Sequence, residues 1–209
     1  MNTTDTQTTL SALTLEVADP AAARAFYADA FGFDSQIDFR ATDAATSGFR
    51  GFSLSLTVAQ PANVNALIDA AVAAGATVLK PVAKSFWGYG GVVQAPDGTI
   101  WKVATSNKKD TAPTSKEYDD LVLLLGATDV AATKRFYVER GLTVAKSYGR
   151  KYVEFDAGSG PLKLALYGRR ALAKDVGVPE EGSGSHRIVL AGSAGPFSDP
   201  DGFVWEASA

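Results

Sequence analysis

Alternation of apolar and polar residues marks the clearest strands of this 209-residue chain. Residues 10–18 alternate with a period of two and residues 52–58 repeat the pattern, so each segment is expected to form a strand with one buried face. The uninterrupted apolar run at 121–125 instead predicts a strand buried on both faces. Further strands are expected at 34–40, 77–80, 89–94, 99–104, 142–147, 150–156, 161–167, 186–190 and 203–207.

Helix start and stop signals separate these strands. Asp19 stands directly before Pro20, which is typical of an N-cap followed by a proline in the first helical turn, and predicts a helix to about Ala30. Gly32 is the expected C-cap of that helix. The remaining pattern predicts helices at 63–74 and 130–140, a short helix or turn at 169–176, and polar loops at 41–47 and 179–185.

The chain nearly repeats itself. The segment from Asp19 to Phe26-Tyr27 has a counterpart from Asp129 to Phe136-Tyr137, at an offset of 129 − 19 = 110 residues. A Pro-Asp-Gly turn followed by tryptophan closes both halves, at 96–101 and 200–205, with an offset of 200 − 96 = 104. Two similar modules in tandem are therefore expected.

The order of elements predicts an α+β protein in which each half is a βαβββ module, with helices on the outer side of curved sheets. We expect a disordered N-terminus at 1–9, a first module at 10–105, a polar linker at 106–117 and a second module at 118–209. The last unit of the second module looks truncated, because nothing between Leu190 and Pro200 predicts a helix.

Composition and charge exclude several classes of function. The net charge of −3 has no basic cluster, which argues against nucleic acid and against a membrane surface as partners. The absence of cysteine excludes disulfides, zinc–thiolate sites and iron–sulfur clusters. Neither a secretory signal nor an apolar stretch of membrane-spanning length is found, so we expect a cytoplasmic protein.

The paired motifs resemble those of the vicinal oxygen chelate superfamily, also called the glyoxalase/bleomycin-resistance/dioxygenase family. The resemblance rests on the strand leading into an Asp and a later Phe-Tyr, and on the closing Pro-Asp-Gly-x-x-Trp, each present twice. It implies paired βαβββ units whose sheets curl into U-shaped cavities. It also implies metal ligands from the first and last strands of each unit, with the metal acting as a Lewis acid on two neighbouring substrate oxygens.

The ligand positions implied by this resemblance are largely lost. In the first module they fall on Ala12, Ser53 and Lys102, and a lysine would repel a cation, so we expect no metal there. In the second module Val122 occupies one position, while Glu206 and His186, the single histidine, are the weak candidates that remain. Metal sites normally use three or four protein ligands.

Glu206 and His186 therefore have two interpretations. Either they act as catalytic base or ligand with a divalent metal such as Zn, Ni, Mn or Fe, or they are structural. In the structural interpretation His186 caps a loop or pairs with a carboxylate, and Glu206 is a solvated or ion-paired strand residue. We favour the structural interpretation, with no cofactor.

Other side chains are candidates for binding a small organic molecule. Trp87 and Tyr89 lie in a glycine-flanked aromatic segment that can form the wall of a pocket, although they can equally fill a core or an interface. Tyr152 and Tyr167 are expected to line a cavity of the second module, and Ser53 and Lys102 one of the first. Trp101 and Trp205 precede Lys102 and Glu206 by one residue, so they are expected to face the core instead.

Three functions are left open by these residues. The first is metal-independent binding of a small organic molecule, as in resistance proteins that sequester a drug. The second is a metal-dependent lyase, isomerase or dioxygenase that uses His186 and Glu206. The third is a structural module with closed cavities, in which an exposed sheet edge favours a homodimer. The first is the hypothesis that we favour.

Overall fold

The computed structural model describes residues 8–86, 88–158 and 162–208. Its four helices are α1 (Pro20–Phe31), α2 (Pro61–Ala73), α3 (Val130–Val138) and α4 (Arg169–Val176). Its strands are β1 (Leu10–Val17), β2 (Asp38–Ala41), β3 (Thr46–Gly48), β4 (Phe52–Thr57), β5 (Thr77–Ser85), β6 (Gly88–Gln94), β7 (Ile100–Thr105), β8 (Asp120–Ala127), β9 (Val144–Tyr148), β10 (Tyr152–Phe155), β11 (Leu162–Gly168), β12 (Gly182–Gly184), β13 (Ile188–Gly192), β14 (Phe197–Ser198) and β15 (Val204–Ala207). The expected α+β class is confirmed, and no helix in the described part of the chain is long and apolar enough to cross a bilayer.

The first helix of each half begins at the predicted aspartate. Asp19 Oδ1 accepts hydrogen bonds from the backbone N–H groups of Ala21 and Ala22 at 2.9 and 3.0 Å. Asp129 Oδ1 accepts the equivalent pair from Ala131 and Ala132 at 2.9 and 3.1 Å. Each carboxylate thus satisfies donors that the first turn leaves free, which explains why the motif starts a helix twice.

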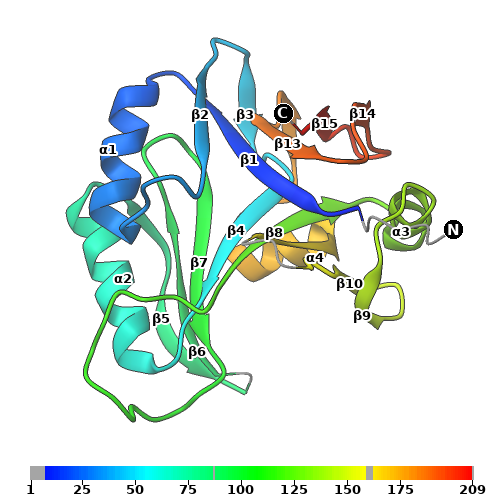
Figure 1. Cartoon of the computed structure of the whole chain (residues 1–209). Coiled ribbons are helices and arrows are strands. Elements are labelled where there is room, and N and C mark those ends of the chain that lie inside the picture. Colours follow the sequence, from blue (N-terminus) through cyan, green and yellow to red (C-terminus); the bar gives the residue numbers. More distant parts are fainter. Residues whose placement is uncertain (1–7, 87, 159–161, 209) are drawn as a thin grey trace, which may run out of the picture.

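The largest sheet has eight strands in the order β5-β6-β7-β4-β8-β11-β10-β9 (Figure 1). Its two arms are a β4-α2-β5-β6-β7 unit and a β8-α3-β9-β10-β11 unit, each with the βαβββ order that the sequence predicts. They meet where β4 and β8 pair antiparallel, with Leu54 opposite Leu123. The sheet therefore crosses from the first half of the sequence into the second.

A five-stranded sheet in the order β14-β15-β13-β1-β2 joins the remaining strands of both halves. Its seam is the antiparallel pair of β1 and β13, in which Leu13 lies opposite Leu190. A small third sheet pairs β12 with β3, two strands that lie inside segments expected to be loops. The two halves of the sequence thus share every sheet, and the domain boundaries at 105 and 118 stay a prediction.

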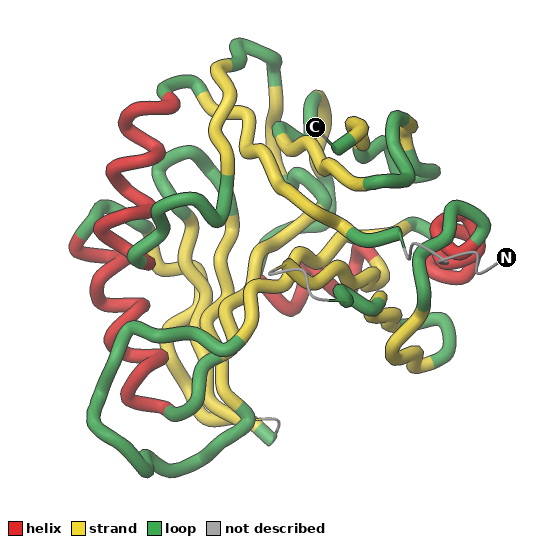
Figure 2. The backbone as a smooth tube through the Cα atoms, in the orientation of Figure 1, coloured by secondary structure: helices red, strands yellow, loops and turns green. Residues whose placement is uncertain are grey.

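The core lies between the two large sheets, with α1, α2 and α3 around it (Figure 2). Leu13 and Leu15 of β1 belong to the same buried cluster as Leu54 of β4 and Leu123 of β8, and all four are at most 1% exposed. The run at 121–125 is buried on one face only, because Val122 and Leu124 on the other face are half-buried. The strand expected at 34–40 also begins late, since β2 starts at Asp38.

Each half has a buried chain of hydrogen bonds that runs from a tryptophan through a tyrosine of its first helix to an aspartate. Trp101 Nε1 donates to the Tyr27 hydroxyl at 3.2 Å, and that hydroxyl donates to Asp97 Oδ2 at 2.9 Å. Trp205 Nε1 donates to the Tyr137 hydroxyl at 3.1 Å, which donates to Asp199 at 2.7 Å. Burial raises the pKa of both tyrosines, so their hydroxyls stay neutral donors. The prediction that both tryptophans face the core is confirmed.

Candidate functional site

The eight-stranded sheet has a core face and an opposite face, which we call the groove face. Strand register places Ser55 beside both Lys102 of β7 and Val122 of β8 on the groove face. Val122 in turn lies beside Lys163 of β11. The resemblance described above implies metal ligands on the first and last strands of each unit, and these side chains lie on such strands. A functional site is therefore expected first on this face.

Helix α4 covers part of the groove face. Leu172, Ala173 and Val176 of α4 are at most 1% exposed and form a second apolar cluster with residues of β6, β7 and β8. Their partners are Val92, Ile100 and, half-buried, Leu124. Ser53 lies beside Leu124 in the register and is buried, so this predicted ligand-binding residue does not face an open cavity.

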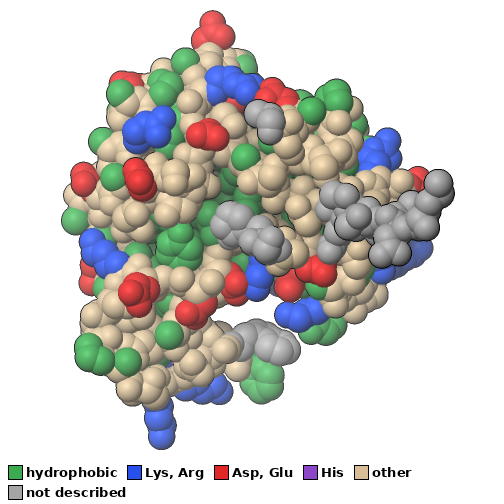
Figure 3. Space-filling view, in the orientation of Figure 1, with side chains coloured by type: hydrophobic (Ala, Val, Ile, Leu, Met, Phe, Trp, Pro, Cys, Tyr) green, Lys and Arg blue, Asp and Glu red, His purple; other side chains and the backbone are tan. Residues whose placement is uncertain are grey.

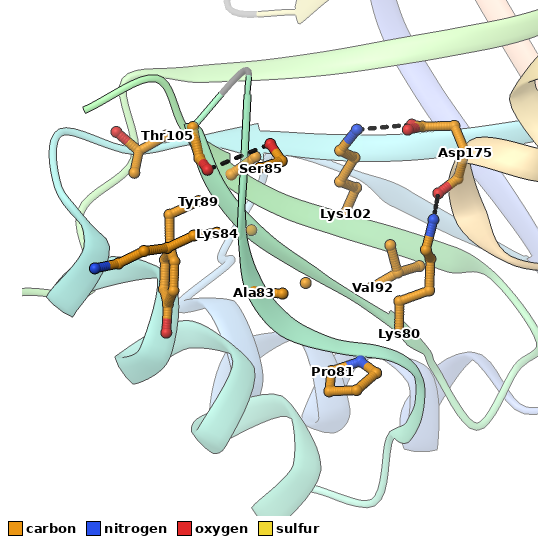
Figure 4. Close-up of a pocket in the computed structure, with 14 residues that line it drawn as sticks. Lys80, Pro81, Ala83, Lys84, Ser85, Tyr89, Val92, Lys102, Thr105 and Asp175 are labelled. Carbon is orange, nitrogen blue, oxygen red and sulfur yellow. Dashed lines mark hydrogen bonds and ion pairs between the residues drawn. The ribbon is translucent and has the colours of Figure 1, made fainter. Parts of the chain in front are cut away.

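An open cleft of about 230 Å³ lies where β5, β6 and β7 meet the C-terminal end of α4. Its apolar wall is formed by Pro81, Ala83, Val92 and Ala104. Its charged lining comprises Lys80, Lys84, Lys102 and Asp175 (Figure 4). Lysine ammonium groups outnumber the carboxylate, so the cleft has the electrostatics of a site for an anion.

Lys102 is the central charged residue of this cleft. Its Nζ forms an ion pair with Asp175 Oδ2 of α4 at 2.7 Å, and the two side chains are 33% and 35% exposed. Lys80 Nζ donates to the backbone carbonyl of the same Asp175 at 2.8 Å. Figure 4 shows Lys80 and Lys102 both directed at Asp175, while Lys84 extends away from it. Lys102 thus lines a cleft, and its role in binding a ligand stays a prediction.

Further ion pairs line the groove face away from the cleft. Lys163 pairs with Asp120 at 2.6 Å, and Lys146 pairs with Glu154 at 3.3 Å. Figure 3 shows acidic and basic side chains gathered beside the hollow at the lower centre of the molecule. The face is thus polar where α4 leaves it open, and each of these lysines already has an internal carboxylate partner.

Tyr89 and Trp87 were the predicted aromatic wall. Tyr89 contributes to the lining of the cleft, but its hydroxyl donates to Asn65 Oδ1 of α2 at 2.9 Å. Its ring is directed at the helix and not at Lys102 in Figure 4. Trp87 lies outside the described residues. Tyr89 is therefore chiefly a strand–helix contact.

Tyr152 and Tyr167 lie on the other arm of the same sheet. Their ring centroids are 6.2 Å apart, and the Tyr152 hydroxyl donates to Glu154 at 2.9 Å. Burial of the hydroxyl is the main reason why the pKa of Tyr152 is raised. Neither ring contributes to the lining of the Lys102 cleft, so the structure does not join these tyrosines to Lys102 in one site.

Glu206 lies on the five-stranded sheet and is held by an arginine. Both Nη atoms of Arg40 donate to the two carboxylate oxygens of Glu206 at 2.9 Å. Arg40 reaches from β2 across β1 and β13, and it also lies 3.8 Å from Glu16. The guanidinium lowers the pKa of the Glu206 carboxyl. Glu206 is therefore the ion-paired strand residue of the structural interpretation.

Replacing Glu206 with glutamine is expected to lower the free energy of unfolding by less than about 1 kcal/mol, because both side chains of the pair are 46% exposed. Since the folded-state pKa of Glu206 is lowered, this contribution is present above the unfolded-state pKa and disappears as the pH falls through the folded value. Urea unfolding at neutral pH and at about pH 4 measures the difference. A loss that is unchanged at acid pH would show that the pair with Arg40 is not its cause.

His186 is fixed by two backbone carbonyls. Its Nδ1 lies 2.5 Å from the carbonyl oxygen of Arg50 and its Nε2 lies 3.1 Å from that of Asp201. The ring stacks on Phe203 with a centroid separation of 4.2 Å. Carbonyl oxygens only accept hydrogen bonds, so neither ring nitrogen directs a lone pair at an open position. His186 ties two loops together, in agreement with its structural interpretation.

The residues present do not fit a divalent metal. The carboxylate of Glu206 binds Arg40, and both nitrogens of His186 face carbonyls. In the register Glu206 lies beside Ala191, which is five residues beyond His186, so strand pairing does not bring these two candidates side by side. Across 8–86, 88–158 and 162–208, no three His, Asp or Glu side chains are grouped as a metal site requires.

Sequence reasoning missed the two residues that pair with Glu206 and Lys102. Arg40 pairs with Glu206, and Asp175 pairs with Lys102. Alternation places Lys102 and Glu206 correctly relative to their neighbouring tryptophans, because it is a local property. Neither partner carries a local signal, since each comes from an element that reaches the site only through the tertiary fold.

Comparison with known proteins identifies the fold. No protein-family model and no curated protein sequence matches the chain. Two point mutants of glyoxalase I from Zea mays have TM-scores of 0.60 and 0.61 at 13% and 12% identity, over 96% of this chain and 92% and 93% of theirs. A putative dioxygenase from Bacillus subtilis has a TM-score of 0.55 at 13% identity, over 94% of this chain and 72% of its own. The chain therefore has the glyoxalase-type fold that its paired motifs predicted.

Proposed function

We propose that this protein binds a small organic anion, without a metal, in the cleft beside Lys102. The observation that carries the proposal is the charge of the lining, in which Lys80, Lys84 and Lys102 are accompanied by a single carboxylate, that of Asp175, among the described residues. The fold of the chain is similar to that of glyoxalase I. At the ligand positions of that fold, this chain has a lysine and an arginine-paired glutamate instead of free donors.

The size of the cleft limits the ligand. At about 230 Å³ it is smaller than the roughly 300–1,000 Å³ of typical drug-sized sites. One charged group at Lys102 and a short apolar body against Pro81, Ala83 and Val92 would fill it. Acids of the size of propionate or benzoate match that description, whereas a large drug does not.

Chemical-shift titration of the uniformly ¹⁵N-labelled protein tests the proposal. The probes are acetate, propionate and benzoate, each beside its neutral amide. We expect binding of the acids at the β5–β7 cleft and weaker or no binding of the amides. Lys102→Gln is expected to weaken acid binding about tenfold, because it removes a charge-assisted hydrogen bond.

Lys163→Gln is the matched control. Lys163 pairs with a carboxylate at 2.6 Å on the same sheet and is 36% exposed, close to the 2.7 Å and 33% of Lys102, but it does not line the cleft. Its loss is expected to leave acid binding unchanged. Equal binding of acids and amides, or equal effects of the two lysine variants, would rule out an anion site at Lys102.

A second candidate function is a structural module with closed cavities. It is favoured by α4, whose buried residues Leu172, Ala173 and Val176 fill part of the groove face. On this alternative none of the probes binds, to the natural protein or to variants of the cleft.

A further inference from the structure

Helix α4 lies on the groove face of the eight-stranded sheet and is additional to its βαβββ units. It follows β11 and precedes β12, outside both complete βαβββ units. Its C-terminal turn delivers Asp175 to Lys102 at the cleft (Figure 4). The one carboxylate among the described lining residues is therefore supplied by a separate segment of chain, directed at the residue to which the proposed anion would bind.

The position of α4 does not depend on that carboxylate. Leu172, Ala173 and Val176 anchor the helix by burial. The backbone carbonyl of Asp175 accepts a hydrogen bond from Lys80, and Gly177 ends the helix in the left-handed conformation at φ 83°. The side chain of Asp175 is free to rotate away from Lys102 while its backbone stays in place.

We propose that Asp175 is a tethered stand-in for the carboxylate of the ligand. This inference rests on the proposed function and refines it, because it names a carboxylate as the anion that Lys102 binds. The incoming acid takes the place of the Asp175 carboxylate on Lys102, and Asp175 turns into solvent. Affinity is then set by competition between two carboxylates, one of them part of the chain.

The exposure of the pair makes the exchange feasible. Both side chains are about one-third exposed, so water solvates the carboxylate that leaves. Ion pairs of this exposure are weak, and removal of the internal competitor is expected to tighten acid binding about threefold to fivefold. The tether nonetheless keeps the competitor at a high local concentration, so only acids that also contact the apolar wall displace it effectively.

Asp175→Asn tests the competition directly. We expect the affinity for propionate and benzoate, measured by the same titration, to rise about threefold to fivefold. Asp120→Asn is the matched control, because Asp120 pairs with Lys163 at 2.6 Å and is likewise 35% exposed, outside the cleft. It should leave acid binding unchanged. Thermal melting of Asp175→Asn, and of Asp175→Ala as a second variant, checks that a change in binding does not come from a change in folding.

A second readout does not need a bound ligand. Trinitrobenzenesulfonate, a small amine-reactive anion, is allowed to react briefly, and the modified lysines are quantified by peptide mass spectrometry. Asp175→Asn should accelerate labelling at Lys102 and not at Lys163, and Asp120→Asn should do the reverse.

The failures of the two proposals are distinguishable. If Lys102→Gln leaves acid binding intact, the proposed function is wrong. If Lys102→Gln weakens binding but Asp175→Asn does not tighten it, the internal competition is wrong and the anion site stands. If no acid binds to the natural protein or to Asp175→Asn, both proposals are wrong, because faster labelling of Lys102 would then show only that Asp175 shields the amine.

Discussion

Replacing Trp205 with alanine is expected to lower the free energy of unfolding by about 3–5 kcal/mol. Trp205 is 1% exposed, and its ring lies 5.3 Å from that of Phe197 and 5.6 Å from that of Tyr137. The substitution leaves a cavity between the five-stranded sheet and α3, and it removes the donor to the buried Tyr137 hydroxyl. Urea unfolding followed by circular dichroism measures the loss.

Two further variants separate the causes of that loss. Trp205→Phe retains a large ring and removes only the indole donor, so about 1–2 kcal/mol is expected for it. Val204→Ala changes the neighbouring residue, which is 43% exposed on the opposite side of β15, and should cost less than about 0.5 kcal/mol. If Trp205→Ala costs no more than Val204→Ala, Trp205 is not the core anchor that we describe.

Replacing His186 with alanine is expected to lower the free energy of unfolding by about 2–4 kcal/mol, because the half-buried ring that bridges two backbone carbonyls is lost together with the hydrogen bond that it donates. These are the carbonyls of Arg50 and Asp201, which precede β4 and β15. The stacking contact with Phe203 is lost as well. Unfolding in urea gives the magnitude, and acid binding at the Lys102 cleft should not change.

A second substitution at this position distinguishes the structural role of His186 from a catalytic one. His186→Gln keeps a side-chain donor and should recover part of the stability, which a purely catalytic histidine would not require. A variant that is as stable as the natural protein but has lost a chemical activity would contradict the structural role.

Local signals predicted the elements well. Asp19 and Asp129 begin their helices because an N-cap depends on a few neighbouring residues. The alternation of β1 assigned its buried face correctly, since side-chain direction follows from the backbone alone. The expectation of one buried face for β4 is wrong, because Ser53 and Ser55 are buried on the face opposite Leu54. The pairing of β4 with β8 and of β1 with β13 was not predictable in this way, because strand order is decided by long-range packing.

The same contrast between local signals and long-range packing applies to the candidate site. Lys102 was expected to line a cavity because the resemblance puts a ligand position there, whereas Ser53, expected in the same cavity, is covered by α4. The segment at 169–176 was expected as a short helix or turn, and its polar sequence did not indicate that it would lie across the eight-stranded sheet. Residues that arrive from a distant segment, such as Asp175, need the folded structure to be recognised.

The sharing of both large sheets between the halves has a consequence for assembly. Each seam, β4 with β8 and β1 with β13, pairs a strand of the first half with a strand of the second, and both belong to one polypeptide. Their association is therefore a first-order event, at a local concentration that the connecting segment fixes. Dilution, which dissociates a two-chain assembly, leaves these seams intact. Each half is also free to diverge without having to recognise a copy of itself, and the opposite charges at Lys102 and Glu206 are an instance of that freedom.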